Sequence, residues 1–336
     1  MRFTGSRTLG PIALMVGALL VAPSWVVAQD HGLSWTVVEA TPAPTARHEN
    51  AFVELDGKLY LLGGRGDRPM EVFDPATGEW TPRATPPVLE LSHMQAAAFG
   101  GKLYLVSAFT GGWPEEASIA NVLIYDPATD VWTTGPEIPA ERRRGASGVV
   151  EHGGLIYVAG GNRRGHNSGY VPWLDVFDPA TGVWTALPDA PHARDHFHAA
   201  VIDGKLYAAA GRRSSHDTGD DMNLTVTAVD VYDIAAGRWS TLEQPIPTPR
   251  AGAATAAFHG RLIVAGGESP AQVPGHAEVE ALDPATGRWS ALPPMPTGRH
   301  GTQATVLEDT LHIVAGSGDR GGGPELADHL VLPPGH

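Results

Sequence analysis

The chain has 336 residues, no cysteine and a formal net charge of −14, from 23 basic and 37 acidic side chains. The lack of cysteine excludes disulfide scaffolds, zinc ribbons and thiol catalysis, and the negative charge argues against nucleic acid as a partner. Hydrophobic residues form 42% of the chain, enough for a folded core, while 41 Gly and 29 Pro favour short strands and turns over long helices.

The N-terminus has the features of a secretory signal peptide. Arg2 and Arg7 precede an apolar run at 12–22, and Ala28 ends a stretch suited to cleavage. The run is too short to cross a bilayer, which favours a cleaved leader over the alternative of an N-terminal anchor. We therefore expect residues 1–28 to be a signal peptide and 29–336 to be one domain. That domain would lie in the periplasm or outside the cell, without membrane insertion.

A turn sequence recurs along the rest of the chain. Asp-Pro-Ala-Thr-Gly-Glu-Trp at 74–80 returns in varied form, and the set of matching tryptophans is Trp35, Trp80, Trp132, Trp184, Trp239 and Trp289. A second element, Gly-Lys-Leu-Tyr-Leu-Leu-Gly-Gly at 57–64, has six copies in phase with them. Six units of roughly 50 residues with these features predict a propeller of four-stranded blades.

In chain order, each unit is predicted to form strands A to D. Examples are strand A at 253–258, strand B at 58–62, strand C at 71–73 or 175–177, and strand D at the tryptophan. In the turn before strand D, Pro fixes φ, Asp accepts hydrogen bonds from later amides, and Gly takes a left-handed conformation. The last unit stops after its third strand at 329–332. We therefore expect the isolated segment 33–38 to supply the missing strand and close the ring.

The glycine pair, the strand B tyrosine and the late tryptophan resemble the Kelch repeat over residues 33–332. This resemblance implies an all-β, six-bladed β-propeller. The departures are local, since Ser107-Ala108 replaces one glycine pair, and Ile263 and His312 replace the tyrosine in two units.

The loops that leave strand B are predicted to share one face with the loops that enter strand A, because successive strands alternate in direction. Three of the strand B loops are long, at 107–121, 162–173 and 212–226, and their candidate ligand-binding side chains are Trp113, Arg163, Tyr170, Trp173 and Arg212. Aromatic rings mixed with charged groups suit a sugar or another polar ligand. The alternative is that these rings only pin the loops to the scaffold.

An arginine recurs at the start of the innermost strand in five of six units: Arg47, Arg144, Arg194, Arg250 and Arg299. Leu91 replaces it in the second unit. One interpretation is a ring of positive charge that binds an anion. The other, which we favour, is a structural position whose guanidinium groups bond loop carbonyls between blades.

Histidines break the repeat near the axis, where other units carry small residues: His48, His93, His196, His198 and His300. Strand alternation would place Arg194, His196 and His198 on one side. Such imidazoles suit acid–base catalysis, hydrogen bonding to a ligand or metal ligation, or they simply line the channel. The spacing of His196 and His198 does not indicate which residue would be a third metal ligand, so we assign no metal and no other cofactor.

These features favour an exported protein that binds a carbohydrate or a protein at the face with the long loops, and they leave its oligomeric state open. The Kelch resemblance also implies an alternative, since periplasmic six-bladed Kelch proteins include a sialic-acid mutarotase/epimerase. That activity on an acidic sugar needs an acid and a base near the anomeric carbon. His196, His198, Arg194, Glu115 or Glu116 could serve, but the resemblance matches no catalytic pair of that family to residues of this chain. Galactose-oxidase-like Kelch proteins are similar in their repeats, but their copper chemistry needs a Tyr–Cys crosslink that this chain lacks.

Overall fold

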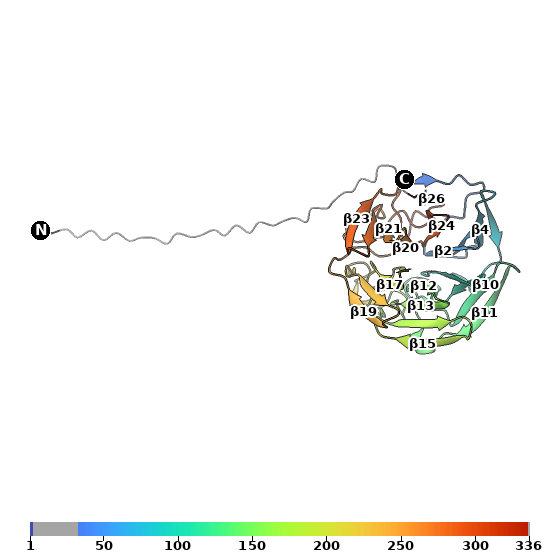
Figure 1. Ribbon diagram of the computed structural model, residues 1–336, viewed down its shortest axis with the longest axis horizontal. Coiled ribbons are helices and arrows are strands. Elements are labelled where there is room, and N and C mark those ends of the chain that lie inside the picture. Colours follow the sequence, from blue (N-terminus) through green and yellow to red (C-terminus); the bar gives the residue numbers. More distant parts are fainter. Residues whose placement is uncertain (3–32, 335–336) are drawn as a thin grey trace.

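The computed structural model describes residues 1–2 and 33–334 and consists of six four-stranded antiparallel sheets around a central axis (Figure 1). This confirms the predicted all-β, six-bladed propeller. Residues 3–28 of the predicted signal peptide lie outside the described residues. Among the helical segments of the described part, none has the length and apolar character needed to cross a membrane.

The blades follow one another around the ring in sequence order, and within each blade the strands run from the axis outward. Blade 1 contains β2 (Asn50–Leu55), β3 (Lys58–Gly63), β4 (Met70–Asp74) and β5 (Glu79–Arg83). Blade 2 contains β6 (Ala97–Phe99), β7 (Lys102–Leu105), β10 (Asn121–Asp126) and β11 (Val131–Glu137). Blade 3 contains β12 (Gly148–His152), β13 (Leu155–Ala159), β14 (Leu174–Asp178) and β15 (Val183–Leu187).

The second half of the ring repeats this plan. Blade 4 contains β16 (Ala199–Ile202), β17 (Lys205–Ala208), β18 (Asp230–Asp233) and β19 (Arg238–Thr241). Blade 5 contains β20 (Ala254–Phe258), β21 (Arg261–Ala265), β22 (Val279–Asp283) and β23 (Arg288–Leu292). Blade 6 contains β24 (Ala304–Leu307), β25 (Thr310–Val314), β26 (His329–Leu332) and β1 (Thr36–Val37). Outside the blades lie the hairpin β8 (Phe109–Thr110) and β9 (Ala117–Ser118), and the short 3-10 helices η1 (Ala140–Arg142) and η2 (His216–Thr218).

The ring is closed by the N-terminal strand, as the sequence predicts. β1 pairs with β26 through Thr36↔Val331 and Val37↔Leu330, and the Val38 amide donates to the His329 carbonyl at 2.8 Å. The Trp35 indole donates to the carbonyl of Pro293 in blade 5 at 2.9 Å. The first described residues of the domain and the last are thus held in one sheet, which covers the edge that β26 would otherwise expose.

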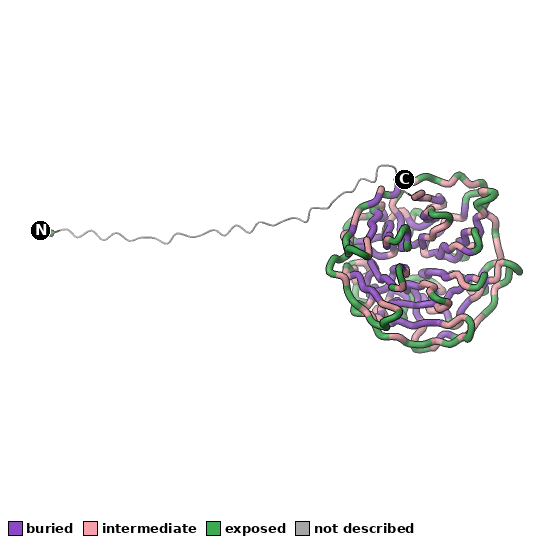
Figure 2. The backbone as a smooth tube through the Cα atoms, viewed as in Figure 1, coloured by how far each residue is buried: buried purple, intermediate pink, exposed green. Residues whose placement is uncertain are grey.

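The repeated turn residues have the roles that their chemistry predicts. In the first copy the Asp74 carboxylate accepts the Ala76 amide at 3.0 Å, and Gly78 has φ of 72°. The tryptophan of strand D then stacks on an aromatic ring of strand C, as in Phe73–Trp80 and Phe177–Trp184 with ring centroids 5.3 and 4.9 Å apart. Buried residues fill the sheets and the space between them, while exposed residues gather at the rim and in the loops (Figure 2).

The glycine pair at the end of strand B allows the next blade to approach closely. At Gly160, with φ of 60°, a Cβ would lie 2.5 Å from the carbonyl oxygen of Arg194 at the entry to blade 4. A side chain there would force the two blades apart. This glycine therefore helps to hold the loops of blades 3 and 4 against each other, at the face where the long loops lie.

Candidate ligand-binding site

A closed ring of backbone hydrogen bonds surrounds the axis just before the innermost strands. Each blade contributes one residue whose amide donates to the carbonyl of the preceding blade, with N···O distances of 2.5–3.0 Å. The six residues are Glu49, His93, Ala146, His196, Gly252 and Gly301. All six have φ between 51° and 67°. Glycine adopts this conformation without strain, so a charged or imidazole side chain at three of the positions is unusual.

A cavity of about 450 Å³ opens above this ring, and its walls come from the predicted face. It is lined by residues from the loops between second and third strands and from the segments that enter the innermost strands: His48, Glu49, Arg65, His93, Trp113, His166, Arg212, Asp221, Met222, Glu268, Gly321 and Gly322. Four of these, His48, His93, Trp113 and Arg212, are residues that the sequence nominates.

Below the ring the channel is blocked by two buried glutamines. The Gln95 side chain accepts the amides of Val149 and Ala199 from blades 3 and 4, and donates to the Ala199 carbonyl. The Gln303 side chain accepts the amides of Phe52 and Ala96 from blades 1 and 2. A void of about 20 Å³ lies at the level of the hydrogen-bonded ring, bordered by His196 and His198 among others. The cavity is therefore a cup that opens on one face.

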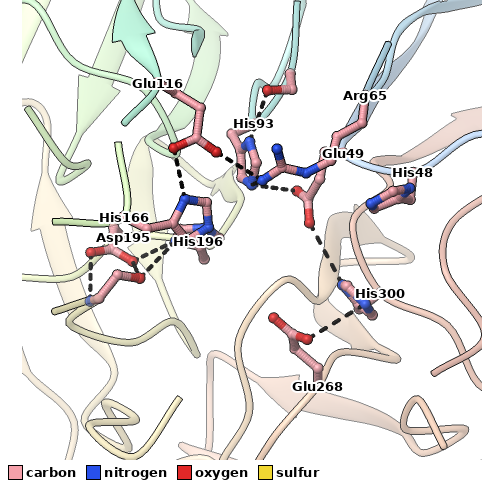
Figure 3. A network of polar contacts seen from close by, with 12 residues as sticks. His48, Glu49, Arg65, His93, Glu116, His166, Asp195, His196, Glu268 and His300 are labelled. Carbon is pink, nitrogen blue, oxygen red and sulfur yellow. Dashed lines mark hydrogen bonds and ion pairs between the residues drawn. The ribbon is translucent and has the colours of Figure 1, made fainter. Parts of the chain in front are cut away.

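Three histidines meet on one side of the cup (Figure 3). His93 and His196 come from the ring, and His166 comes from the β13–β14 loop. Their ring centroids lie 4.8–4.9 Å apart, and the Nε2 atoms of His166 and His196 are separated by 3.1 Å. All three are buried. We call His93, His166 and His196 the histidine cluster.

The Nδ1 atom of each cluster histidine faces an anchoring side chain. The partners are Ser92 Oγ for His93 at 2.9 Å, Glu116 Oε2 for His166 at 3.0 Å and Asp195 Oδ1 for His196 at 2.5 Å. Because a carboxylate only accepts, the Nδ1 atoms of His166 and His196 carry the proton. Anchored in this way, the three rings direct their Nε2 atoms inward.

A second group of charged side chains, which includes Glu49, Glu268 and His300, lies beside the histidine cluster (Figure 3). The Glu49 carboxylate is 3.7 Å from His300 Nδ1 and 3.5 Å from His93 Nε2, and His300 Nε2 is 3.5 Å from Glu268. Arg212 forms a buried ion pair with Glu268. Within the described residues, His48 Nε2 and His300 Nδ1 have no hydrogen-bond partner.

Burial and neighbouring charges set the protonation of these groups. Burial, together with the other cluster histidines, holds the pKa of His93 well below its usual value. Burial and then Arg212 lower the pKa of His196, although Asp195 opposes them. Burial disfavours the charged form of Glu116, but the His166 and Arg65 contacts outweigh it and lower the pKa to about 2. For Glu49, burial is outweighed by His300, His196 and His48, so its pKa is lowered. Burial thus favours the neutral form of the His93 and His196 imidazoles, whereas the carboxylates of Glu49 and Glu116 are held in the ionised form.

The recurring arginines do not line the cup. Each is buried and bonded to carbonyl groups and one acidic residue of its own blade, and the five acidic partners are Glu71, Asp175, Asp230, Glu280 and Asp328. Arg250, for example, donates to Glu280 at 2.6 Å and to the Val264 carbonyl at 2.9 Å. This arrangement supports the structural interpretation of Arg47, Arg144, Arg194, Arg250 and Arg299, with one correction. The bonds stay within a blade and do not run between blades.

Other nominated residues lie away from the cup or at its edge. The indole of Trp173 stacks beneath the guanidinium groups of Arg142 and Arg163 at 4.2 and 5.3 Å, and Tyr170 stacks beneath Arg213 at 5.9 Å. These rings pin their loops, as the alternative reading predicts. His198 borders the small void, with burial lowering its pKa to about 4. The predicted alternation of Arg194, His196 and His198 is wrong, because β16 begins only at Ala199 and His196 has positive φ.

Sequence reasoning missed Glu49, Arg65, Glu268 and the third cluster histidine, His166, as site residues. Glu49 could have been found, since it follows its arginine by two residues as His196 follows Arg194. The β21–β22 and β25–β26 loops, which bring Glu268 and Gly322 to the cup, were not singled out. Arg65 and Glu268 could also have been found, because each directly follows the glycine pair of its unit, as Arg212 follows the Ala-Gly pair that replaces it in blade 4. His166 lies further along a loop of different length in each unit, so the alignment of repeats gives no signal for it.

Comparisons with known proteins agree with this architecture. A family profile described as the Attractin/LZTR1 beta-propeller matches residues 26–271, and the Kelch motif matches residues 249–296. The chain is 29% identical over 289 residues to Kelch-like protein terF of Aspergillus terreus, covering 80% of this chain and 61% of that protein. It is 23% identical over 274 residues to human Kelch-like protein 23, covering 80% of this chain and 45% of that protein.

The chain thus spans less than two thirds of the length of these two relatives. Among solved structures, that of YjhT matches with a TM-score of 0.73 and 18% identity, covering 87% of this chain and 96% of that one. This likeness establishes a shared fold.

Proposed function

The chain belongs to the Attractin/LZTR1 beta-propeller family of Kelch-type propellers, and from this premise we propose that it binds a small carbohydrate in its axial cup. The observation that carries the proposal is the cup itself, a cavity of about 450 Å³ that is blocked below and walled by charged side chains. This volume is in the range of sites for small molecules. A small polar ligand therefore suits the cup better than a protein surface does.

The wall chemistry is that of a site for a polyhydroxylated ligand. Glu49, Glu268 and Arg212 can accept from or donate to hydroxyl groups, and His48 Nε2 has no hydrogen-bond partner in the part of the chain that the structure describes. Trp113 stands at the cup with 53% of its surface exposed, and its ring contacts His216 edge-on at 4.5 Å. A half-exposed indole beside polar groups can stack on the apolar face of a sugar.

We also propose that the protein acts outside the cytoplasm. The basic residues, apolar run and cleavage-like sequence within residues 1–28 support export to the periplasm or the medium. A carbohydrate ligand would then be met in the extracytoplasmic space.

One observation favours a second candidate, a sugar mutarotase. Glu49 lines the cup, and the buried His300 lies 3.7 Å behind it, with no hydrogen-bond partner for its Nδ1 among the described residues. A carboxylate and an imidazole within one sugar ring of each other could remove and return the protons needed to open the ring. The acidic sugar considered from the sequence is less favoured, because Arg65 and Arg212 are already paired with Glu116 and Glu268.

A glycan array followed by calorimetry tests the proposed binding. We expect the purified protein to bind one class of glycan, and Trp113→Ala to weaken that binding about tenfold because the stacking surface is lost, equivalent to about 1.4 kcal/mol. Leu89→Ala is the matched control. Leu89 is an apolar residue of similar exposure, at 60%, and it does not line the cup.

The outcome decides between the candidates. Absence of any glycan ligand, or equal affinity in Trp113→Ala and wild type, would reject the proposed site. If the bound sugar also shows faster anomer exchange by NMR, and Glu49→Gln abolishes this acceleration while sugar binding persists, the mutarotase is supported. Binding without acceleration leaves the protein a binding module.

A further inference from the structure

In the histidine cluster, imidazole lone pairs face one another without a hydrogen-bond donor between them. His166 and His196 carry their protons on Nδ1, toward Glu116 and Asp195. Their Nε2 atoms, which then have lone pairs, face each other at 3.1 Å. Two acceptors at that distance repel one another unless a positive charge lies between or beside them.

The third ring can complete the same pattern. His93 Nδ1 faces Ser92, and its Nε2 faces the Arg65 guanidinium at 3.4 Å. The same Nε2 lies 3.5 Å from the Glu49 carboxylate, and the Ser92 hydroxyl can donate or accept, so His93 can carry its proton on either ring nitrogen. With that proton on Nδ1, His93 joins His166 and His196 in offering a lone pair to one volume, and the ligand atoms of the three residues lie within 4.8 Å of one another.

The surroundings carry an excess of negative charge. Glu49, Glu116 and Asp195 contact the cluster histidines, whereas Arg65 is the basic side chain in contact with the cluster and is paired with Glu116. Arg212 and Glu268 cancel each other as an ion pair. A cation placed among the three rings would therefore be favoured by the local charge as well as by the lone pairs.

We propose that His93, His166 and His196 bind a divalent transition-metal ion, and we use Zn²⁺ as the ion for the geometric comparison and for the test. Three imidazoles are typical ligands for Zn²⁺, Cu²⁺, Ni²⁺ or Fe²⁺. Nitrogen ligands about 2.1 Å from one zinc ion lie roughly 3.4 Å apart, which the 3.1 Å pair nearly matches, and the ligand atom of the third ring lies within 4.8 Å of the other two. The carboxylates on Nδ1 of two rings are the partners that orient metal-bound histidines in many proteins.

The open side of the site faces the cup. His93 and His166 both line the cavity, so a metal held by three protein ligands keeps a coordination position toward a ligand bound there. This inference goes beyond the proposed carbohydrate binding, because the site is defined by the cluster alone. It assigns Glu116 as a positioning residue that acts through His166.

Titration of the chelator-treated protein with Zn²⁺ tests the site. We expect one ion per chain, and a loss of affinity of at least about 100-fold in His166→Ala, which removes a ligand from a loop and leaves the blades intact. Glu116→Gln should weaken binding by about 10- to 100-fold, because it removes the charge that orients His166. His216→Ala is the matched control, since His216 lies on the same face but bonds Asp221 outside the cluster, and its affinity should equal that of wild type.

A second measurement needs no variant. Cu²⁺ bound to the wild-type protein should show electron paramagnetic resonance coupling to three imidazole nitrogens, and Co²⁺ should give visible ligand-field bands. Failure of the wild-type protein to bind any of these ions would overturn the proposal. So would unchanged zinc affinity in His166→Ala, or a copper spectrum with fewer than three nitrogen ligands.

Discussion

At the scale of single residues, the buried arginines show how the repeat balances its charges. Five blades bury an arginine together with an acidic residue from the third strand or the loop before it. Blade 2 has lost both partners at once, since Leu91 replaces the arginine and Leu123 stands where Glu280 stands in blade 5. Both leucines are buried. A buried ion pair can be exchanged for an apolar pair, but neither partner can be removed alone.

Blade 5 allows this rule to be tested. Arg250→Leu would leave the Glu280 carboxylate, which is 7% exposed, without its partner, so we expect the free energy of unfolding to fall by about 3–5 kcal/mol. The double variant Arg250→Leu/Glu280→Leu reproduces the pair of blade 2 and should recover most of that loss. Denaturant unfolding of the two single variants and the double variant gives the comparison. A double variant as unstable as the sum of both single changes would contradict the argument.

At the scale of elements, the strand that closes the ring is very short but makes contacts with two blades. β1 has two residues, yet it adds the fourth strand to blade 6 and positions Trp35 against blade 5. In an antiparallel pair, alternate residues direct their amides to the partner. Val38 does so toward His329, and the register places Val37 between bonded positions.

Two proline variants distinguish the loss of the hydrogen bond that closes the ring from the general effect of placing a proline in β1. Val38→Pro removes the amide that bonds His329 and should lower the free energy of unfolding by about 1–3 kcal/mol. Val37→Pro, one residue earlier, removes an amide that does not point at β26 and should cost much less. Thermal unfolding of both variants measures the difference. Equal losses would mean that closure does not depend on this hydrogen bond.

The elements also show what the repeat could and could not reveal. The blade strands were predictable because each copy repeats a turn whose Asp, Pro and Gly have fixed conformational roles, and the final strand is found at His329–Leu332 as expected. The β8–β9 hairpin was not, because it lies in a long loop whose length and sequence differ from those of the other copies. The positive φ before β16 was not predicted either, although all six copies share it, because non-glycine residues fill that position in four of them. For the same reason His93 and His196, which stand in an aligned column, were found as site candidates, whereas His166, in a loop without a counterpart, was not.

At the scale of the whole molecule, the ring of six hydrogen bonds makes the site a property of all blades together. Glu49, His93 and His196 occupy ring positions with positive φ, which costs of order 1 kcal/mol or more for each residue that is not glycine. Gly252 and Gly301 meet the same geometric need without that cost. Glu49 and His93 line the cup and His196 belongs to the histidine cluster, so three of the four strained positions carry side chains of the site, and closure of the ring holds them there.

The closing blade also makes the stability of the whole ring depend on pH. His312 and His329 bond each other at 2.9 Å inside blade 6, and His329 packs edge-on against Phe73 of blade 1 at 5.0 Å. Burial lowers the pKa of His312 to about 4, and burial together with His312 lowers that of His329 to about 3. Both rings are therefore neutral in the folded state at pH 5, whereas in the unfolded chain they take up protons as the pH falls below 6.5.

Because the unfolded state binds the extra protons, stability is complete above pH 6.5 and declines as the pH falls toward 4. Each histidine should contribute a loss of roughly 1–2 kcal/mol between pH 7 and pH 5. His312→Tyr replaces one of them by the residue that most other blades carry at this position, and it should flatten the decline relative to wild type. Denaturant unfolding at several pH values measures the slope, and His259→Asn, on an exposed turn, should leave it unchanged. A wild-type stability that stays level from pH 7 to pH 5 would show that these buried rings do not control acid unfolding.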